Sequence, residues 1–263
     1  MPAVALAFAL AAAVFHAAWN LLLARAPHVE AATAVALVTA EIVFAPVAVV
    51  VWHVDGRVWP WLVASGAFEL VYFALLATAY RKAPLSVVYP VARGGAPVVV
   101  LLVTWSVAGR QAIGVLLVAA GVLLVRGVRH PDRVGLAFGA AIACCIAGYT
   151  LVDKHGIAYA NPVTYLELSM LVPTVAYAGA VARTTDLRRA VTPASVVAGI
   201  ATFVAYGFVL AALERAPAAS VAAVRETSVV VAAILAVVVL KEPFRVSRLA
   251  GAAVVVAGVA LLR

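Results

Sequence analysis

Apolar stretches of about 20 residues, the length that crosses the hydrocarbon core of a bilayer, recur along the whole of this 263-residue chain. Short connectors that carry charged residues, Gly or Pro separate them. The pattern predicts an all-α polytopic membrane protein of ten transmembrane helices with only short loops. The predicted spans are 3–24, 33–52, 61–80, 84–106, 111–126, 134–152, 162–182, 193–213, 217–240 and 245–262.

Composition excludes the soluble classes. Hydrophobic residues make up 67% of the chain and charged residues 11%, whereas soluble domains average about 45–50% and about 25%. The net charge of +8 predicts no nucleic-acid partner, because the Arg residues gather at span ends, where they signal topology and anchor headgroups. The first apolar stretch lacks a basic leader segment, so we expect a membrane helix there and not a signal peptide.

Internal repeats predict the domain organisation. Residues 6–21 align with 136–151 at an offset of 130, and Lys82-Ala-Pro84 matches Arg215-Ala-Pro217 at an offset of 133. Residues 113–126 align with 250–263 at an offset of 137, with seven identities in fourteen positions. We therefore predict two related five-helix repeats, 1–130 and 131–263. An odd number of spans inverts the second repeat, an arrangement that places a transporter's substrate site where the halves meet.

Three segments resemble the EamA-type, ten-helix drug/metabolite transporter superfamily. They are His16-Ala-Ala-Trp-Asn20, the stretch from Tyr80 to Arg93, and Val224-Arg-Glu-Thr-Ser228 with Leu240-Lys-Glu242. The resemblance covers essentially the whole chain. It implies two inverted five-helix repeats around a central cavity, and export of amino acids, other metabolites or drugs through the cell (plasma or inner) membrane.

One departure from that family concerns the end of the fourth helix of each repeat. Family repeats close it with Gly-Glu, which Leu240-Lys-Glu242 resembles, whereas the first half reads Val107-Ala-Gly-Arg-Gln111. We therefore expect asymmetric ends.

Ionisable side chains inside a span are costly, and they mark functional-site candidates. Tyr89 and Arg93 share a helix face at i, i+4, and Arg225 lies at the corresponding place of the second half at an offset of 132 if one gap is allowed. Two arginines facing a cavity would bind a carboxylate or phosphate bidentately. The alternative is that each pairs with a nearby carboxylate, namely Glu41, Glu69, Glu167 or Glu226.

Other polar faces point to the same cavity. His16 and Asn20 lie at i, i+4 with Trp19 beside them, and the matching face of the sixth span carries Tyr149, Thr150 and Asp153. Packing between helices is the rival interpretation, since Asn and His often join membrane helices. The full predicted substrate-binding set is His16, Trp19, Asn20, Glu69, Tyr72, Tyr89, Arg93, Tyr149, Thr150, Tyr206, Arg225 and Glu226.

Three further expectations concern single residues. Asp153 lies near a span end and is expected to be a solvated cap. Pro90 and Pro97 flank Arg93 inside a span and are the expected sites of a helix break. Burial among apolar groups disfavours the charged form of a carboxylate, so Glu69 or Glu226 is the expected proton carrier.

The predicted function is a secondary transporter that exports a small organic metabolite such as an amino acid, organic anion or drug-like compound, with protons as the candidate coupling ion. We expect no catalytic residues, metal or cofactor, because HExxH, GxSxG and P-loop motifs are absent from the sequence. A flippase for lipid-linked sugars or phosphates and an intramembrane enzyme are the alternatives. The oligomeric state stays open.

Orientation in the membrane also has two readings. Connectors 1, 3, 5, 7 and 9 hold most of the Arg and Lys residues, so the positive-inside rule predicts that they are cytoplasmic and that both termini are outside. The family resemblance implies termini inside. Both readings place the termini on one side.

Overall fold

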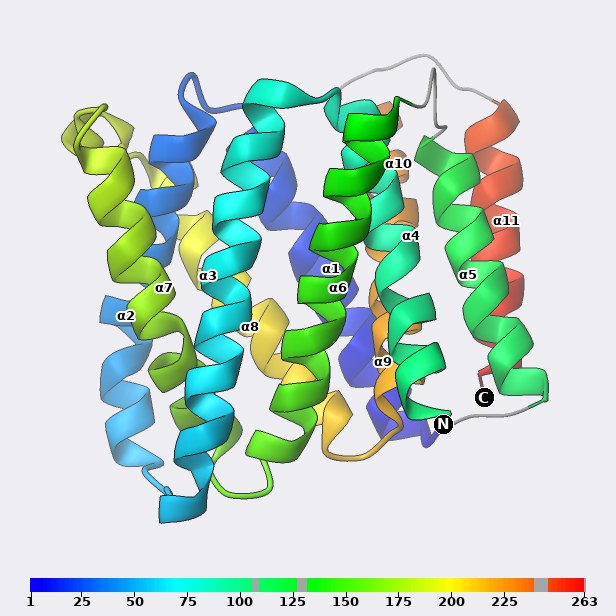
Figure 1. The fold of residues 1–263 in the computed structure, drawn as a ribbon, viewed down its shortest axis with the longest axis horizontal. Helices are drawn as coiled ribbons and strands as arrows, with labels where there is room; N and C mark the ends of the chain where they lie inside the picture. The colour runs from blue at the N-terminus through cyan, green and yellow to red at the C-terminus, as the bar shows by residue number, and fades with distance from the viewer. Residues whose placement is uncertain (106–108, 127–131, 239–245, 263) are drawn as a thin grey trace.

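The computed structural model describes residues 1–105, 109–126, 132–238 and 246–262 and forms a bundle of helices that run between two ends of the molecule (Figure 1). The first half contains α1 (Ala3–Ala24), α2 (Val29–Val50), α3 (Trp59–Lys82), α4 (Leu85–Thr104) and α5 (Arg110–Arg126). The second half contains α6 (Arg133–Gly156), α7 (Pro162–Ala182), α8 (Pro193–Leu213), α9 (Ala218–Arg225), α10 (Ser228–Val238) and α11 (Val246–Leu261). Short 3₁₀ turns, η1 (Gly56–Val58) and η2 (Leu187–Ala190), precede α3 and α8.

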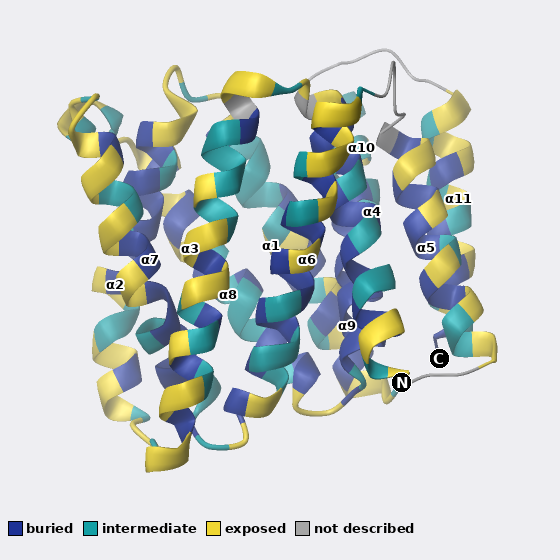
Figure 2. Cartoon of the chain, in the orientation of Figure 1, coloured by how far each residue is buried: buried dark blue, intermediate teal, exposed yellow. Residues whose placement is uncertain are grey.

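The helices confirm a polytopic membrane protein. Eight of the described helices are long and apolar enough to cross a membrane, with α9 and α10 together forming one of them, and α5 and α11 are shorter apolar helices. Large apolar side chains such as Ile42 and Val175 are 69% and 65% exposed. Figure 2 shows such exposed positions along the outward faces of the helices. In a bilayer these faces contact lipid tails, which are as apolar as the side chains themselves.

Local sequence explains where several helices begin. The side chain of Asp132 accepts a hydrogen bond from the backbone N–H of Gly135 at the start of α6, at 3.1 Å. Thr192 and Ser195 form a reciprocal capping box at the start of α8. Such caps satisfy backbone N–H groups that have no partner inside the helix.

The contacts between helices join the two halves throughout. Helix α1 packs on α8 and α3 packs on α6, while α2 packs on α7 and α5 on α11. The pair α4 and α6 has its counterpart in α1 with α9 and α10. The pairings are symmetric between the halves. If each helix is replaced by its counterpart in the other half, for example α1 by α6 and α8 by α3, every pairing becomes another of these pairings or stays the same.

Glycines show that α5 and α11 run antiparallel. An added Cβ at Gly114 would lie 2.7 Å from the backbone oxygen of Gly258, and one at Gly121 would lie 2.8 Å from the backbone oxygen of Gly251. Contact therefore moves backward along α11 as it moves forward along α5. These are the helices whose sequences match best between the halves. Inversion of the complete repeats remains a prediction.

The helix break lies elsewhere than expected. Helix α4 is continuous through Pro90 and Pro97, whereas the predicted span 217–240 divides into α9 and α10. At the junction the N–H of Thr227 donates to the oxygen of Val224 at 3.0 Å, and its side-chain hydroxyl donates to the same oxygen at 2.8 Å. The tighter 3₁₀ pattern and the competing hydroxyl interrupt the regular helix without a proline.

Both ends of the chain meet at one end of the bundle, which we call the N-terminal end. The amino group of Met1 donates a hydrogen bond to the backbone oxygen of Leu262 at 2.9 Å. Figure 1 shows the connectors α2–α3, α6–α7 and α8–α9 at this same end. The prediction that the termini lie on one side is confirmed.

Candidate functional site

A cavity of about 430 Å³ lies between the two halves and is lined by α1, α2, α3 and α4 on one side and α6, α7, α8 and α9 on the other. Ten of the twelve predicted site residues line it: His16, Trp19, Asn20, Glu69, Tyr72, Tyr89, Arg93, Tyr149, Tyr206 and Arg225. Thr150 and Glu226 do not. The hydroxyl of Thr150 instead donates to the backbone oxygen of Ile146 in its own helix, at 2.6 Å.

Arg93, Arg225 and Glu226 form a buried charge cluster beside the cavity. Glu226 is fully buried, and its Oε1 accepts a hydrogen bond from Nη1 of Arg93 at 3.2 Å. The Nε of Arg225 lies 3.7 Å from the same oxygen. Nε and Nη2 of Arg93 also donate to the hydroxyl of Tyr89, each at 3.4 Å. One carboxylate thus lies between two guanidinium groups, an arrangement that leaves an excess of positive charge at the cavity wall.

The repeat correspondence at this cluster needs a correction. Helix α4 begins one residue after Pro84 and α9 begins one residue after Pro217, so no gap separates these prolines from the cluster. The counterpart of Arg93 is therefore Glu226, at the same offset of 133 as the prolines, and not Arg225. The equivalent residues Arg93 and Glu226 have opposite charges and attract each other, whereas two arginines at these positions would repel each other.

Two of the other carboxylates in the arginine-pairing alternative, Glu41 and Glu167, lie apart from the cluster. The hydroxyl of Thr174 in α7 donates to Oε1 of Glu41 in α2 at 3.0 Å, and Glu167 also belongs to α7. Neither carboxylate lines the cavity. This pair belongs to the contact between α2 and α7.

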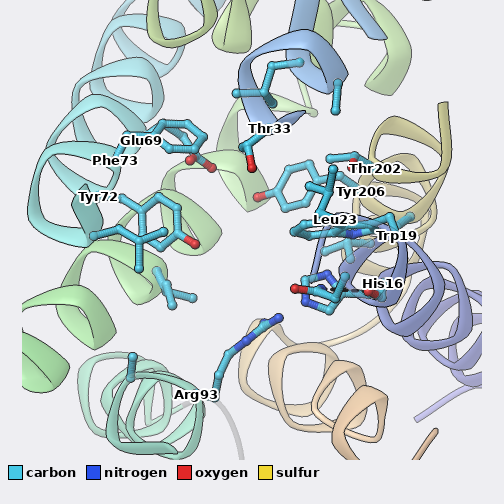
Figure 3. A pocket seen from close by; sticks show the side chains of 18 of the residues that line it. His16, Trp19, Leu23, Thr33, Glu69, Tyr72, Phe73, Arg93, Thr202 and Tyr206 are labelled. Atoms are coloured by element: carbon cyan, nitrogen blue, oxygen red, sulfur yellow. Dashed lines mark hydrogen bonds between the residues drawn. The ribbon is translucent and has the colours of Figure 1, made fainter. Parts of the chain in front are cut away.

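Figure 3 shows how the polar groups face the cavity. The Glu69 carboxylate and the Tyr72 hydroxyl point inward from α3, and the Arg93 guanidinium points inward from α4. On the opposite wall His16 and Trp19 contact each other with ring centroids 4.9 Å apart. Among the described residues, no hydrogen bond or ion pair is formed by Glu69.

The first helix uses its polar groups partly within itself. The side-chain amide of Asn20 donates to the backbone oxygen of His16 at 2.7 Å. In the part of the chain that the structure describes, the buried indole N–H of Trp19 has no acceptor. His16, Trp19 and Asn20 all line the cavity, which favours the cavity role of this helix face over a role in helix packing.

Asp153 is not the solvated cap that its place in the sequence indicates. Helix α6 continues to Gly156, and Asp153 is only 1% exposed. Its Oδ1 accepts hydrogen bonds from the hydroxyls of Ser65, at 2.6 Å, and Tyr165, at 2.9 Å. Its Oδ2 accepts a hydrogen bond from the hydroxyl of Tyr206. Of these three hydroxyl residues, only Tyr206 lines the cavity.

The cavity is exposed at one end. The lining residues Ala24 and Val29, at the connector between α1 and α2, are exposed. Lining residues nearer the N-terminal end, namely Ala12, Leu166 and Val209, are 0%, 3% and 2% exposed. The mouth therefore lies at the end opposite the chain termini, which we call the mouth end.

Sequence reasoning missed part of this lining. Thr33, Phe73, Met170 and Thr202 line the cavity in addition to the predicted residues. Thr202 precedes Tyr206 by four positions and so shares its helix face, a signal that the sequence did contain. Residues 107, 108 and 240–242, which enter the expected asymmetry of the repeat ends, lie outside the described residues.

Comparisons with known proteins agree with this architecture. Residues 133–263 match the family model described as "EamA-like transporter family". A solved structure titled "Crystal structure of protein" superposes with a TM-score of 0.78 at 17% identity, over 99% of this chain and 96% of that chain. The fold is therefore shared over the whole length. No curated protein matches the sequence.

Proposed function

We propose that this chain, which belongs to the EamA-like transporter family through residues 133–263, is a secondary transporter that exports a small anionic or zwitterionic metabolite across the cell membrane. The cavity of about 430 Å³ falls within the roughly 300–1,000 Å³ typical of small-molecule sites. Its place between the halves is where alternating access needs a binding site.

The observation that carries the proposal is the sharing of one carboxylate by two arginines. Arg93 and Arg225 both lie against Oε1 of Glu226, and within the described chain the Nε of Arg225 makes no hydrogen bond. A carboxylate or phosphate on the substrate would compensate the remaining positive charge. Such charge-assisted hydrogen bonds are stronger than neutral ones. Arginine and tyrosine side chains then select a substrate with an anionic group and an apolar or aromatic body.

Glu69 is the proton carrier in this proposal. Glu226 is held by the arginines, whereas the Glu69 carboxylate faces the cavity (Figure 3) and has no hydrogen-bond partner within the described residues. A cavity that alternately opens to water and closes would change the solvation of this carboxylate and hence its proton affinity. Proton exchange would in this way accompany each passage.

Transport by purified protein in proteoliposomes tests the proposal. We expect saturable uptake and counterflow of one class within a panel of amino acids, organic anions and cationic drugs, with a dependence on an imposed pH gradient. The informative variant is Arg93→Ala, because Glu226 then still faces Arg225 and the buried carboxylate does not lose both of its partners. It should fold and lose transport.

Arg57→Ala is the matched control. Arg57 also pairs with a carboxylate, with its Nη2 2.8 Å from Oδ2 of Asp55, but this pair is exposed and lies outside the cavity. Transport should be unchanged in this variant. Full transport by Arg93→Ala would refute the cavity proposal. Movement of lipid-linked phosphate reporters, with none of the soluble solutes transported, would favour a flippase, since the arginines suit a phosphate equally well.

A further inference from the structure

The N-terminal end of the cavity is closed by a contact between helices on its two sides. Asp153 belongs to α6, which packs on α3 and α4, whereas Tyr206 belongs to α8, which packs on α1 and α2. The Tyr206 hydroxyl donates to Oδ2 of Asp153. This hydrogen bond therefore connects α6 and its neighbours with α8 and its neighbours at the N-terminal end of the cavity. Tyr206 itself forms part of the cavity wall.

Two further hydroxyls fix the position of the carboxylate. Ser65 of α3 and Tyr165 of α7 both donate to Oδ1 of Asp153, which leaves Oδ2 for Tyr206. Ser65 and Asp153 are 2% and 1% exposed. With water excluded, each of these hydrogen bonds to a carboxylate contributes more than it would at a surface. The Asp153 carboxylate is thus oriented toward α8 before Tyr206 approaches.

The corresponding positions at the mouth end stand apart. At the repeat offsets of 130 and 133, Asp153 corresponds to Leu23 and Tyr206 corresponds to Phe73. Both counterparts line the cavity, and in the view of Figure 3 Phe73 and Leu23 lie on different sides with Thr33 and Tyr206 between them. The hydrophobic clusters to which they belong are separate. The contact that is made at the closed end is therefore absent between these two residues at the open end.

The positioning residues follow the same correspondence. At an offset of 133, Ser65 corresponds to Ala198 and Tyr165 to Ala32, and these alanines pack with Leu23 in one cluster. The cluster around Asp153 and the cluster around Leu23 thus occupy equivalent places at opposite ends of the molecule. The first is hydrogen-bonded and the second is apolar. The two ends of the molecule therefore differ in one contact across the cavity: Tyr206 is hydrogen-bonded to Asp153, whereas Phe73 and Leu23 belong to separate clusters.

We propose that the hydrogen bond from Tyr206 to Asp153 is the latch that closes the cavity at the N-terminal end, and that Ser65 and Tyr165 position its carboxylate. For the substrate to leave at that end, the latch must open while Leu23 and Phe73 approach each other at the mouth. The inference rests on alternating access as the proposed function. Its test uses solvent access alone, so a failure of the transport proposal would be recognised separately.

The test measures the side from which a cavity cysteine reacts. With Cys144 and Cys145 replaced by Ser, Thr202→Cys places one reporter thiol in the cavity wall. A membrane-impermeant maleimide is applied to sealed right-side-out and inside-out vesicles without any solute. The parent should react from the mouth side. Tyr206→Phe should raise the labelling rate from the N-terminal side by about tenfold or more, the factor expected for losing a hydrogen bond to a charged acceptor.

Tyr177→Phe is the matched control, because its hydroxyl donates to the backbone oxygen of Glu30 at the mouth end, at 3.5 Å. It should leave labelling from the N-terminal side as in the parent. Asp153→Asn is a second latch variant, in which the new side chain has nearly the same shape as the original. If Tyr206→Phe fails to fold, labelling of Asp153→Asn from the N-terminal side tests the latch. The latch is overturned if the folded latch variants react from the N-terminal side no faster than the parent.

Discussion

Single residues show how far helix-face reasoning can reach. The i, i+4 spacing of Tyr89 and Arg93 correctly predicts that they contact each other, since positions four apart share a helix face. The same reasoning places Asp153 on the face of Tyr149, four positions before it, but Asp-Lys-His at 153–155 reads as the end of a span and led to the wrong expectation of a solvated cap. Its three hydroxyl partners come from three other helices. A sequence alone does not say which helices will surround such a carboxylate.

At this scale the first prediction concerns proton coupling. Glu69→Gln removes the titratable group that faces the cavity while keeping its shape. Proton-driven accumulation should be lost, whereas counterflow, which needs no net proton movement, should persist. Both are measured in proteoliposomes at inside and outside pH values between 5 and 8. Accumulation that survives in this variant would assign coupling to another group, and Glu226→Gln is the next variant to compare.

Asp55→Asn is a control on pH dependence. Hydrogen bonds from the Arg57 side chain and backbone hold the pKa of Asp55 at about 2, below its ordinary 3.8. A lowered pKa stabilises the folded state above pH 3.8, and this contribution is lost as pH falls through about 2. Asp55 therefore does not titrate between pH 5 and 8. We expect the transport pH profile of Asp55→Asn to match that of the parent, and a shifted profile would contradict this assignment.

At the scale of helices, apolar length and end signals are strong predictors while internal breaks are not. The predicted spans 3–24, 162–182 and 193–213 coincide with α1, α7 and α8. The break between α9 and α10 was not foreseen, because Thr227 carries no sign in the sequence that its hydroxyl will compete for a backbone oxygen. Pro90 and Pro97, in contrast, are tolerated inside α4, as neighbouring helices allow in membranes.

The close contact between α5 and α11 gives a prediction for stability. A Cβ at Gly121 would lie 2.6 Å from Cγ2 of Val255 and 2.8 Å from the backbone oxygen of Gly251. Gly121→Ala should therefore lower the free energy of unfolding by about 1–3 kcal/mol, the usual cost of overpacking. Gly179→Ala is the control, since nothing lies within 4 Å of its added Cβ. It should stabilise α7 by about 0.5–1 kcal/mol.

Thermal unfolding in one detergent, followed by circular dichroism, compares the two glycine variants. The expected order of midpoints is Gly179→Ala, parent, Gly121→Ala. An unchanged midpoint for Gly121→Ala would mean that α5 and α11 can separate without cost. The close approach of their backbones would then have little part in stability.

For the whole molecule, the repeated sequence predicted two related halves with a site where they meet, and the structure has a cavity lined by helices of both halves. The cavity between the halves, together with most of its polar lining, follows from that one expectation. Which end of the cavity would be open could not be predicted. A sequence with two similar halves favours neither end, and the choice depends on a few contacts such as that between Tyr206 and Asp153.

The hydrogen bond between Met1 and Leu262 has a consequence for biosynthesis. Because the two ends touch, a short linker could join them, and the chain could be reopened between Arg126 and Asp132. Such a circular permutant would present the second half to the insertion machinery first. If the permutant reaches the membrane and folds with the parent's unfolding midpoint and labelling pattern, folding does not require the first half to be synthesised before the second.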